Sequence, residues 1–71
     1  MLLKQRTLSP RQREALWYTA HGLTARQIGE SMGCSEQTVK NFLYFARIKY
    51  QASNNAHLVY LAFGTPDITS A

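Results

Sequence analysis

The sequence is poor in several residue types, and each shortage excludes a class of protein. A single cysteine, Cys34, rules out an intramolecular disulfide, and we expect it to fill a small apolar site. No apolar run approaches the roughly 18 residues that a membrane span needs, and no secretory signal pattern opens the chain. Acidic residues number four against eight lysines and arginines, which gives a net charge of +4. This balance favours a polyanionic partner, and we expect a cytoplasmic protein.

The chain also lacks the residue groupings that enzymes use. There is no Ser-His-Asp order, no glycine-rich phosphate loop and no set of metal ligands, and His21 and His57 are expected at the surface. We therefore expect no catalytic residue, no metal and no cofactor. Its 71 residues allow one domain, without a separate ligand-binding domain. A domain of this size buries only about 60% of its unfolded surface, which favours a partner subunit.

Start and stop signals divide the chain into four helices. The first is expected to begin after Ser9, with Pro10 at its first position and Gln12 completing a capping box, and to stop at Gly22. The other helices are predicted at about 25–32, 36–50 and 56–63. Strand-like alternation is absent, so the predicted fold class is all-α. We expect an N-terminal arm over 1–7, the helical domain over 8–64 and a C-terminal tail over 65–71.

Apolar spacing predicts which side of each helix faces the core. The expected core positions are Ala15, Leu16, Thr19, Ala20, Leu23, Ile28, Met32, Val39, Leu43, Ala46, Tyr50, Leu58, Leu61 and Ala62. Leu8, which precedes the cap, is expected to pack on the first turn as a hydrophobic staple. Gly29 is expected to permit a close helix contact. Trp17 lies beside the core stripe, where it either packs one edge on the core or forms a docking patch for another protein.

Residues 24–44 have the layout of a helix-turn-helix unit. Thr24 and Gln27 predict a capping box, Gly33 predicts a left-handed helix end, and Ser35 predicts the cap of the second helix. Such a pair can place the N-terminal part of its second helix in a major groove, which is about 12 Å wide in B-DNA. Binding of double-stranded DNA is therefore the first functional hypothesis.

Four motifs occur in order along the chain. They are Leu-Ser-Pro-Arg-Gln-Arg-Glu-Ala-Leu over 8–16, Gly-Leu-Thr over 22–24, Ser-Glu-Gln-Thr-Val-Lys over 35–40 and Asn-Asn-Ala-His-Leu-Val over 54–59. With these motifs, residues 8–63 resemble the DNA-binding domain of LuxR-type regulators, the GerE-like helix-turn-helix family. The resemblance implies a four-helix fold that binds DNA and regulates transcription. Region 4 of a bacterial sigma factor is an alternative, but it usually lacks a fourth amphipathic helix.

The chain departs from the family pattern at four positions. Gln12 replaces an acidic residue, so an ion pair made there in relatives cannot form. Phe42 stands where a histidine is common, Gln51 replaces a glycine, and Asn55 replaces an arginine that often opens the last helix. These departures concern details of phosphate contact and leave the expected fold unchanged.

The resemblance places base contacts on the outward face of the third helix, at Lys40, Asn41 and Tyr44. The chemistry agrees, since lysine can donate to guanine, asparagine can pair with adenine, and tyrosine offers a hydroxyl and an apolar ring. Gln37 can reach a base or a phosphate, and Glu36 can accept from cytosine. The residues expected to contact phosphates are Thr24, Arg26, Thr38, Arg47 and Lys49, with Arg11 and Arg13 secondary.

The fourth helix carries more apolar surface than one small domain can cover. We expect Val59, Tyr60 and Phe63 to remain uncovered, and the resemblance implies a two-fold homodimer through this helix. One alternative is an interaction module that pairs with a full-length LuxR-type regulator and blocks it; another is that the residues are an excised DNA-binding domain. Contact with RNA polymerase also stays open.

Overall fold

Four helices make up the part of the chain that the structure, a computed structural model, describes, which is residues 8–64. They are α1 (Pro10–Ala20), α2 (Ala25–Met32), α3 (Glu36–Tyr50) and α4 (Asn55–Phe63). This stretch contains no strand, so the all-α prediction is confirmed. None of its helices is long and apolar enough to cross a membrane. The expected arm over 1–7 and tail over 65–71 lie outside the described residues.

Side-chain caps explain where α1 and α2 begin. Ser9 Oγ accepts from the Gln12 main-chain N–H at 3.1 Å, and Gln12 Oε1 accepts from the Ser9 N–H at 3.0 Å. Thr24 and Gln27 repeat this reciprocal pair at 3.2 and 2.9 Å. Each pair satisfies N–H groups that have no partner within the helix. Both predicted capping boxes are confirmed.

The turn between α2 and α3 depends on two glycines. Gly33 ends α2 in the left-handed conformation, with a φ of 74°, as predicted. Gly29 lies against the turn itself, because a Cβ there would be 2.7 Å from the Cys34 carbonyl oxygen. Ser35 then caps α3 by accepting from the Thr38 N–H at 3.0 Å. The turn therefore holds α2 and α3 close together.

The fourth helix begins one residue earlier than the sequence predicted, at Asn55 instead of Ala56. Asn54 is its cap, and Asn54 Oδ1 accepts from the His57 N–H at 2.8 Å. His57 is half-buried, and its Nδ1 accepts from the Ser53 N–H at 3.0 Å. A pair of adjacent asparagines left the boundary ambiguous, since either can cap a helix.

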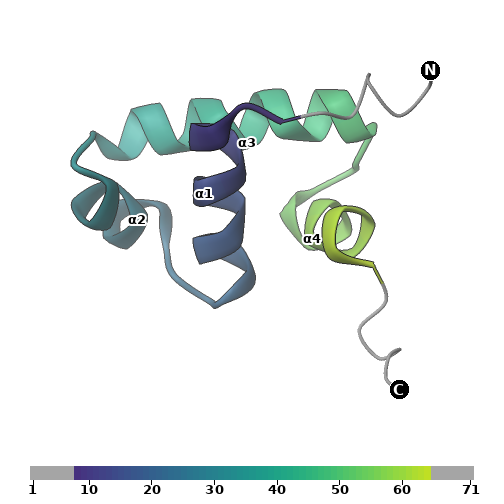
Figure 1. Cartoon of the computed structure of the whole chain (residues 1–71), viewed down its shortest axis with the longest axis horizontal. Helices are drawn as coiled ribbons and strands as arrows, with labels where there is room; N and C mark the ends of the chain where they lie inside the picture. Colours follow the sequence, from purple (N-terminus) through teal and green to yellow (C-terminus); the bar gives the residue numbers. More distant parts are fainter. Residues whose placement is uncertain (1–7, 65–71) are drawn as a thin grey trace.

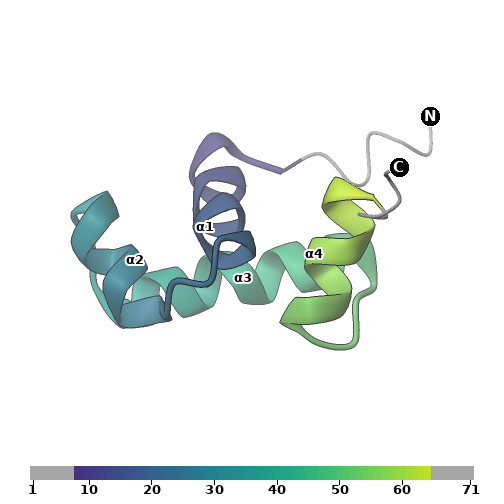
Figure 2. The same cartoon turned by 90° about the horizontal axis from the view of Figure 1, so that it is seen from below.

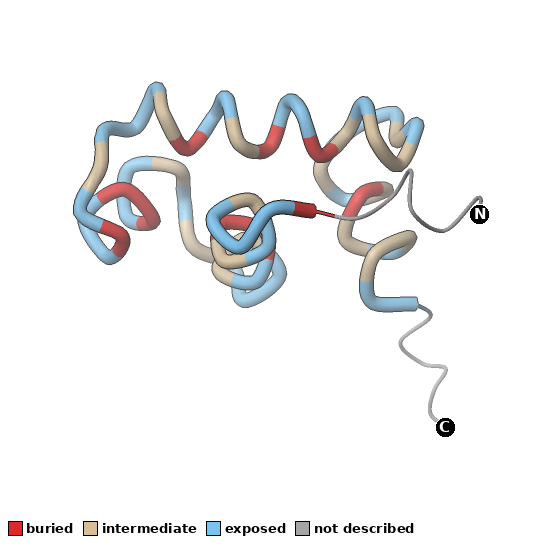
Figure 3. Tube along the Cα trace, turned by 45° about the horizontal axis from the view of Figure 1, so that its top comes forward, coloured by how far each residue is buried: buried red, intermediate tan, exposed pale blue. Residues whose placement is uncertain are grey.

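The other three helices all lie on one side of α3 (Figure 1). Seen from below, α1 stands between α2 and α4, which lie toward opposite ends of α3 (Figure 2). The buried positions of α3 turn toward these three helices, while its opposite side is exposed along its length (Figure 3). Since no described helix covers that side, α3 presents an open face to a partner.

Each helix contributes one large side chain to the centre of the core. Leu16, Ile28, Val39 and Leu58 are all less than 2% exposed. The remaining buried apolar side chains are Leu8, Ala15, Met32, Leu43 and Ala46. Eight of the nine were predicted core positions, and Leu8 was predicted to pack as a staple on the first turn. Burial of such apolar surface is the main favourable term in folding.

The structure corrects two details of the predicted packing. Ala20 is exposed although its spacing places it on the core stripe, because α1 extends beyond the point where it crosses α3 (Figure 1). Val59 was expected to find too little domain to cover it, yet it is half-buried and packs against the core. Cys34 is also half-buried against the core, as expected.

Candidate nucleic-acid interface

The four predicted base-contact residues lie together on the open side of α3. Gln37, Lys40, Asn41 and Tyr44 are all exposed. Their spacing places them within two turns of the helix, starting one residue after its first position. The N-terminal half of α3 therefore carries a continuous polar surface that ends in an aromatic ring.

Side chains on this surface are paired with each other along the helix. Gln37 Nε2 donates to Asn41 Oδ1 at 3.1 Å. The Asn41 amide keeps both of its N–H donors and a second lone pair on oxygen, so that it can still meet the edge of an adenine. Lys40 Nζ lies 3.4 Å from Glu36 Oε2. Both pairs are exposed, and their partners can be exchanged for those on a ligand at small cost.

Arg47 connects the tyrosine of this surface to the start of α4. Its guanidinium carbon lies 5.9 Å from the centre of the Tyr44 ring, within the range of a cation–π contact. Arg47 Nη1 donates to Asn55 Oδ1 at 2.6 Å. The half-buried arginine therefore fixes the position of α4 relative to α3, and its other N–H groups remain available as donors.

A polar groove of about 360 Å³ runs along the flank of α3 that carries Lys40 and Arg47. It is lined by Thr24 from the cap of α2, by Lys40 and Arg47 from α3, and by Asn55 from α4, together with Thr19, Leu23, Ala25 and Leu43. The fold thus brings together three of the predicted contact residues from separate parts of the sequence. Asn55 was missed as a site residue, although it occupies the position where relatives often carry an arginine.

The remaining predicted phosphate contacts lie elsewhere. Arg26 is on α2 with its side chain 80% exposed, and its Nε is 3.9 Å from Glu30 Oε2. The Thr38 hydroxyl is 2.9 Å from Ser35 Oγ at the start of α3. Lys49 Nζ donates to Gln12 Oε1 at 3.1 Å. Gln12 therefore accepts a hydrogen bond from a cationic side chain, although it is not the acidic residue of the family pattern.

Of the two secondary candidates, Arg11 has a structural partner. It donates to the main-chain carbonyl oxygen of Met32 and forms an ion pair with Glu14. Arg13 is exposed on the same helix. Arg11 therefore links α1 to α2, whereas Arg13 faces solvent.

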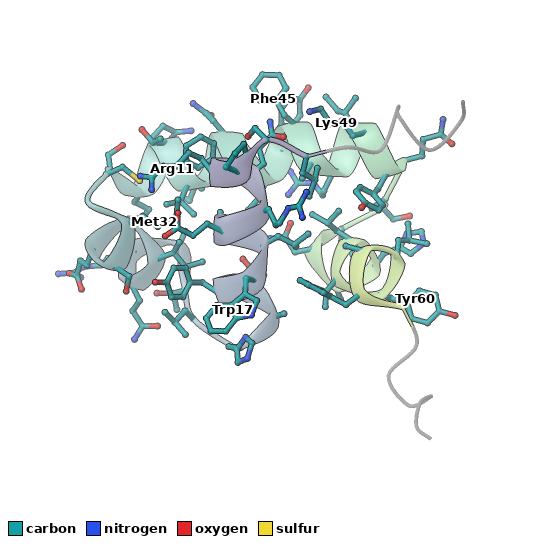
Figure 4. The ribbon with its side chains drawn as sticks, in the orientation of Figure 1. Arg11, Trp17, Met32, Phe45, Lys49 and Tyr60 are labelled. Carbon is teal, nitrogen blue, oxygen red and sulfur yellow. The ribbon has the colours of Figure 1, made fainter. Side chains whose placement is uncertain are left out.

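The predicted dimerisation residues divide into two groups. Tyr60 and Phe63 are 52% and 50% exposed, whereas Val59 packs against the core. All three line an apolar groove of about 410 Å³ between α4 and the end of α1, with Trp17 on its other side. Trp17 is 50% exposed and lies 4.0 Å from His21 between ring centroids. Tyr60 points away from α4, and Trp17 lies near the end of α1 that is farther from α3 (Figure 4).

A short helix, a glycine turn and a second, open-faced helix packed on a small core define a helix-turn-helix DNA-binding domain. The sequence model of a family described as bacterial regulatory proteins of the LuxR family matches residues 6–62 of the 71-residue chain. The chain therefore belongs to the LuxR family, which comprises DNA-binding transcription regulators and is not a family of enzymes. No curated protein and no solved structure gives a significant match.

Proposed function

We propose that this protein binds specific sites on double-stranded DNA as a homodimer, with α3 in the major groove. The observation that carries the proposal is the open side of α3, where Gln37, Lys40, Asn41 and Tyr44 are all exposed. An α-helix fits the major groove only if one whole side is uncovered, because bases are reached from that side. Family membership supports DNA as the ligand.

Each side chain on this surface has a base-edge partner that suits its chemistry. Asn41 can bond N6 and N7 of adenine with both ends of its amide, and Gln37 holds that amide from the preceding turn. Lys40 can donate to O6 and N7 of guanine once its ion pair with Glu36 is broken. We assign discrimination among DNA sequences to these residues and to Tyr44.

Cationic and hydroxyl side chains follow both flanks of the helix. Thr24 and Arg47 line the polar groove on one flank. Thr38 and Lys49 are about three turns apart on the other flank. Arg26 adds a charge from α2. This arrangement suits contacts to the phosphates on either side of a major groove, which position a protein without reading bases.

We assign homodimerisation to the exposed side of α4. Tyr60 and Phe63 expose about half of their surface next to the groove that ends at Trp17. Two copies of this small domain would bury these rings against each other in an isologous contact. A dimer would set two α3 helices into successive major grooves, about 10 bp apart, and would select an inverted-repeat site.

Selection from a pool of duplexes with a randomised centre tests the proposal. We expect an enriched inverted repeat, bound with a log–log salt slope of about 0.9 per neutralised phosphate. A scrambled duplex of the same length and composition is the control, and it should bind more weakly with a similar salt dependence. If no sequence is enriched, or if affinity is the same at low and physiological salt, sequence-specific DNA binding is excluded.

A further inference from the structure

The C-terminal half of the open side of α3 is apolar, which is unusual for a helix face that no other helix covers. Tyr44, Phe45 and Ile48 are 51%, 51% and 54% exposed. We call these three residues the outer apolar patch. Its two rings contact each other edge to face, with centroids 5.3 Å apart and planes 71° apart. Such a contact restrains both rings relative to the helix.

The patch continues the row of predicted base-contact residues. Positions 41, 45 and 48 recur at the spacing of one side of a helix, opposite the buried row of Val39 and Ala46. Figure 4 shows Phe45 on the side of α3 that faces away from the other helices. A ligand that lies along this side of α3 and contacts Asn41 therefore also lies next to Phe45, one helical turn further on.

We propose that Phe45 is a specificity-determining residue that contacts the 5-methyl group of a thymine beside the base bound by Asn41. This inference rests on the proposed insertion of α3 into the major groove. The thymine methyl is the apolar group on the major-groove edges of the bases, and phenylalanine is one of the side chains that packs against it. Tyr44 supports the Phe45 ring from the side through the edge-to-face contact.

The charges around the patch favour DNA over a protein as its occupant. Lys40 lies one turn before Tyr44, and the Arg47 guanidinium lies over the Tyr44 ring at 5.9 Å. The described residues place no acidic side chain later than Glu36 on α3. An apolar centre with cations beside it matches a thymine-containing groove between two rows of phosphates.

Replacing thymine by uracil removes only the methyl group and so tests this contact directly. The probe is the duplex enriched by selection, with each thymine of one half-site replaced in turn by deoxyuridine. We expect one position at which affinity falls about fourfold, which corresponds to about 0.8 kcal/mol for one buried carbon. Phe45→Ala should bind the thymine duplex about as weakly as wild type binds the uracil duplex, and should not distinguish the two.

Three controls make the experiment decisive. Uracil in the flanking sequence should have no effect, Phe45→Leu should retain part of the methyl preference, and circular dichroism should show that both variants remain folded. If wild type selects a site and Asn41→Ala loses discrimination, but uracil is tolerated everywhere, the Phe45 inference is overturned while the proposed function stands. If no site is selected, both fail. If Phe45→Ala alters sedimentation and not uracil sensitivity, the patch binds protein and the inference is overturned.

Discussion

The guanidinium of Arg11 donates a hydrogen bond to the main-chain carbonyl oxygen of Met32 at 2.8 Å. The bond joins the first turn of α1 to the last turn of α2, where helix carbonyls have no partner within the helix. Arg11 also pairs with Glu14 at 3.0 Å, which holds the guanidinium in place. The link orients α2 directly before the turn into α3 and so helps to position the DNA-binding helix.

Loss of this link should destabilise the domain. We expect Arg11→Met to lower the free energy of unfolding by about 1–2 kcal/mol, because the charged donor to the Met32 carbonyl is removed. Arg13→Met on the same helix is the matched control and should change the free energy of unfolding by less than about 0.5 kcal/mol. Urea denaturation measures both. Equal effects of the two substitutions would show that stability depends on the net charge of the domain and not on the Arg11–Met32 hydrogen bond.

The end of α3 offers a stabilising substitution. Gln51 has a φ of 56°, so it occupies the left-handed conformation that glycine adopts most easily. We expect Gln51→Gly to raise the free energy of unfolding by about 0.5–1 kcal/mol, since the strain of a side chain in this conformation is removed. Gly33→Ala should have the opposite effect, because Gly33 has a φ of 74° at the end of α2. A lower thermal midpoint for Gln51→Gly would contradict the backbone argument.

Substitutions on the open side of α3 should separate base contacts from phosphate contacts. Lys40→Ala, Asn41→Ala and Tyr44→Ala should each weaken the selected site by roughly 1–3 kcal/mol and leave random DNA nearly unchanged. Arg26→Ala should weaken both duplexes alike and lower the salt slope by about 0.9. Competition binding with the two duplexes measures the difference. Unchanged discrimination in all three variants would show that α3 does not read the bases.

Removing the charge of Glu36 should strengthen DNA binding. The carboxylate pairs with Lys40 at 3.4 Å and repels phosphates, so Glu36→Gln releases the lysine and removes the repulsion. We expect affinity for all duplexes to rise about threefold at low salt, with a smaller gain at physiological salt because exposed charges are screened. A filter-binding series at several salt concentrations provides the measurement. A fall in affinity for the selected site alone would instead identify Glu36 as a base contact.

The exposed tyrosine of α4 tests the dimer. Tyr60→Glu and Tyr60→Lys should each give a folded monomer that binds the inverted repeat about a hundredfold more weakly, because two linked contacts become one. Opposite charges are used so that repulsion from DNA cannot explain both results, and Tyr60→Phe should remain dimeric. Sedimentation of wild-type monomers, both alone and on the repeat with one copy per site, would exclude the homodimer. It would also leave the α4 surface to a different partner, such as a LuxR-type regulator.

Local chemistry made much of the helix-turn-helix unit predictable. The capping boxes at Ser9 and Thr24 and the glycine at position 33 act within a few residues, so their hydrogen bonds and backbone conformation follow from neighbouring sequence. The place of Asn55 in the polar groove could not be predicted from neighbouring sequence. Its contact with Arg47 joins two helices, and the groove that they line with Thr24 exists only when three segments meet.

The sequence by itself determined the four helices, most of the core residues and membership of the LuxR family, because caps, apolar spacing and motif order are properties of contiguous residues. Only the tertiary structure decided which apolar side chains stay uncovered. Ala20 is exposed and Val59 is partly covered because burial depends on where one helix crosses another. Helical spacing alone places Asn41 and Phe45 in one row of α3, but only the packing of the other three helices decided that this side stays uncovered.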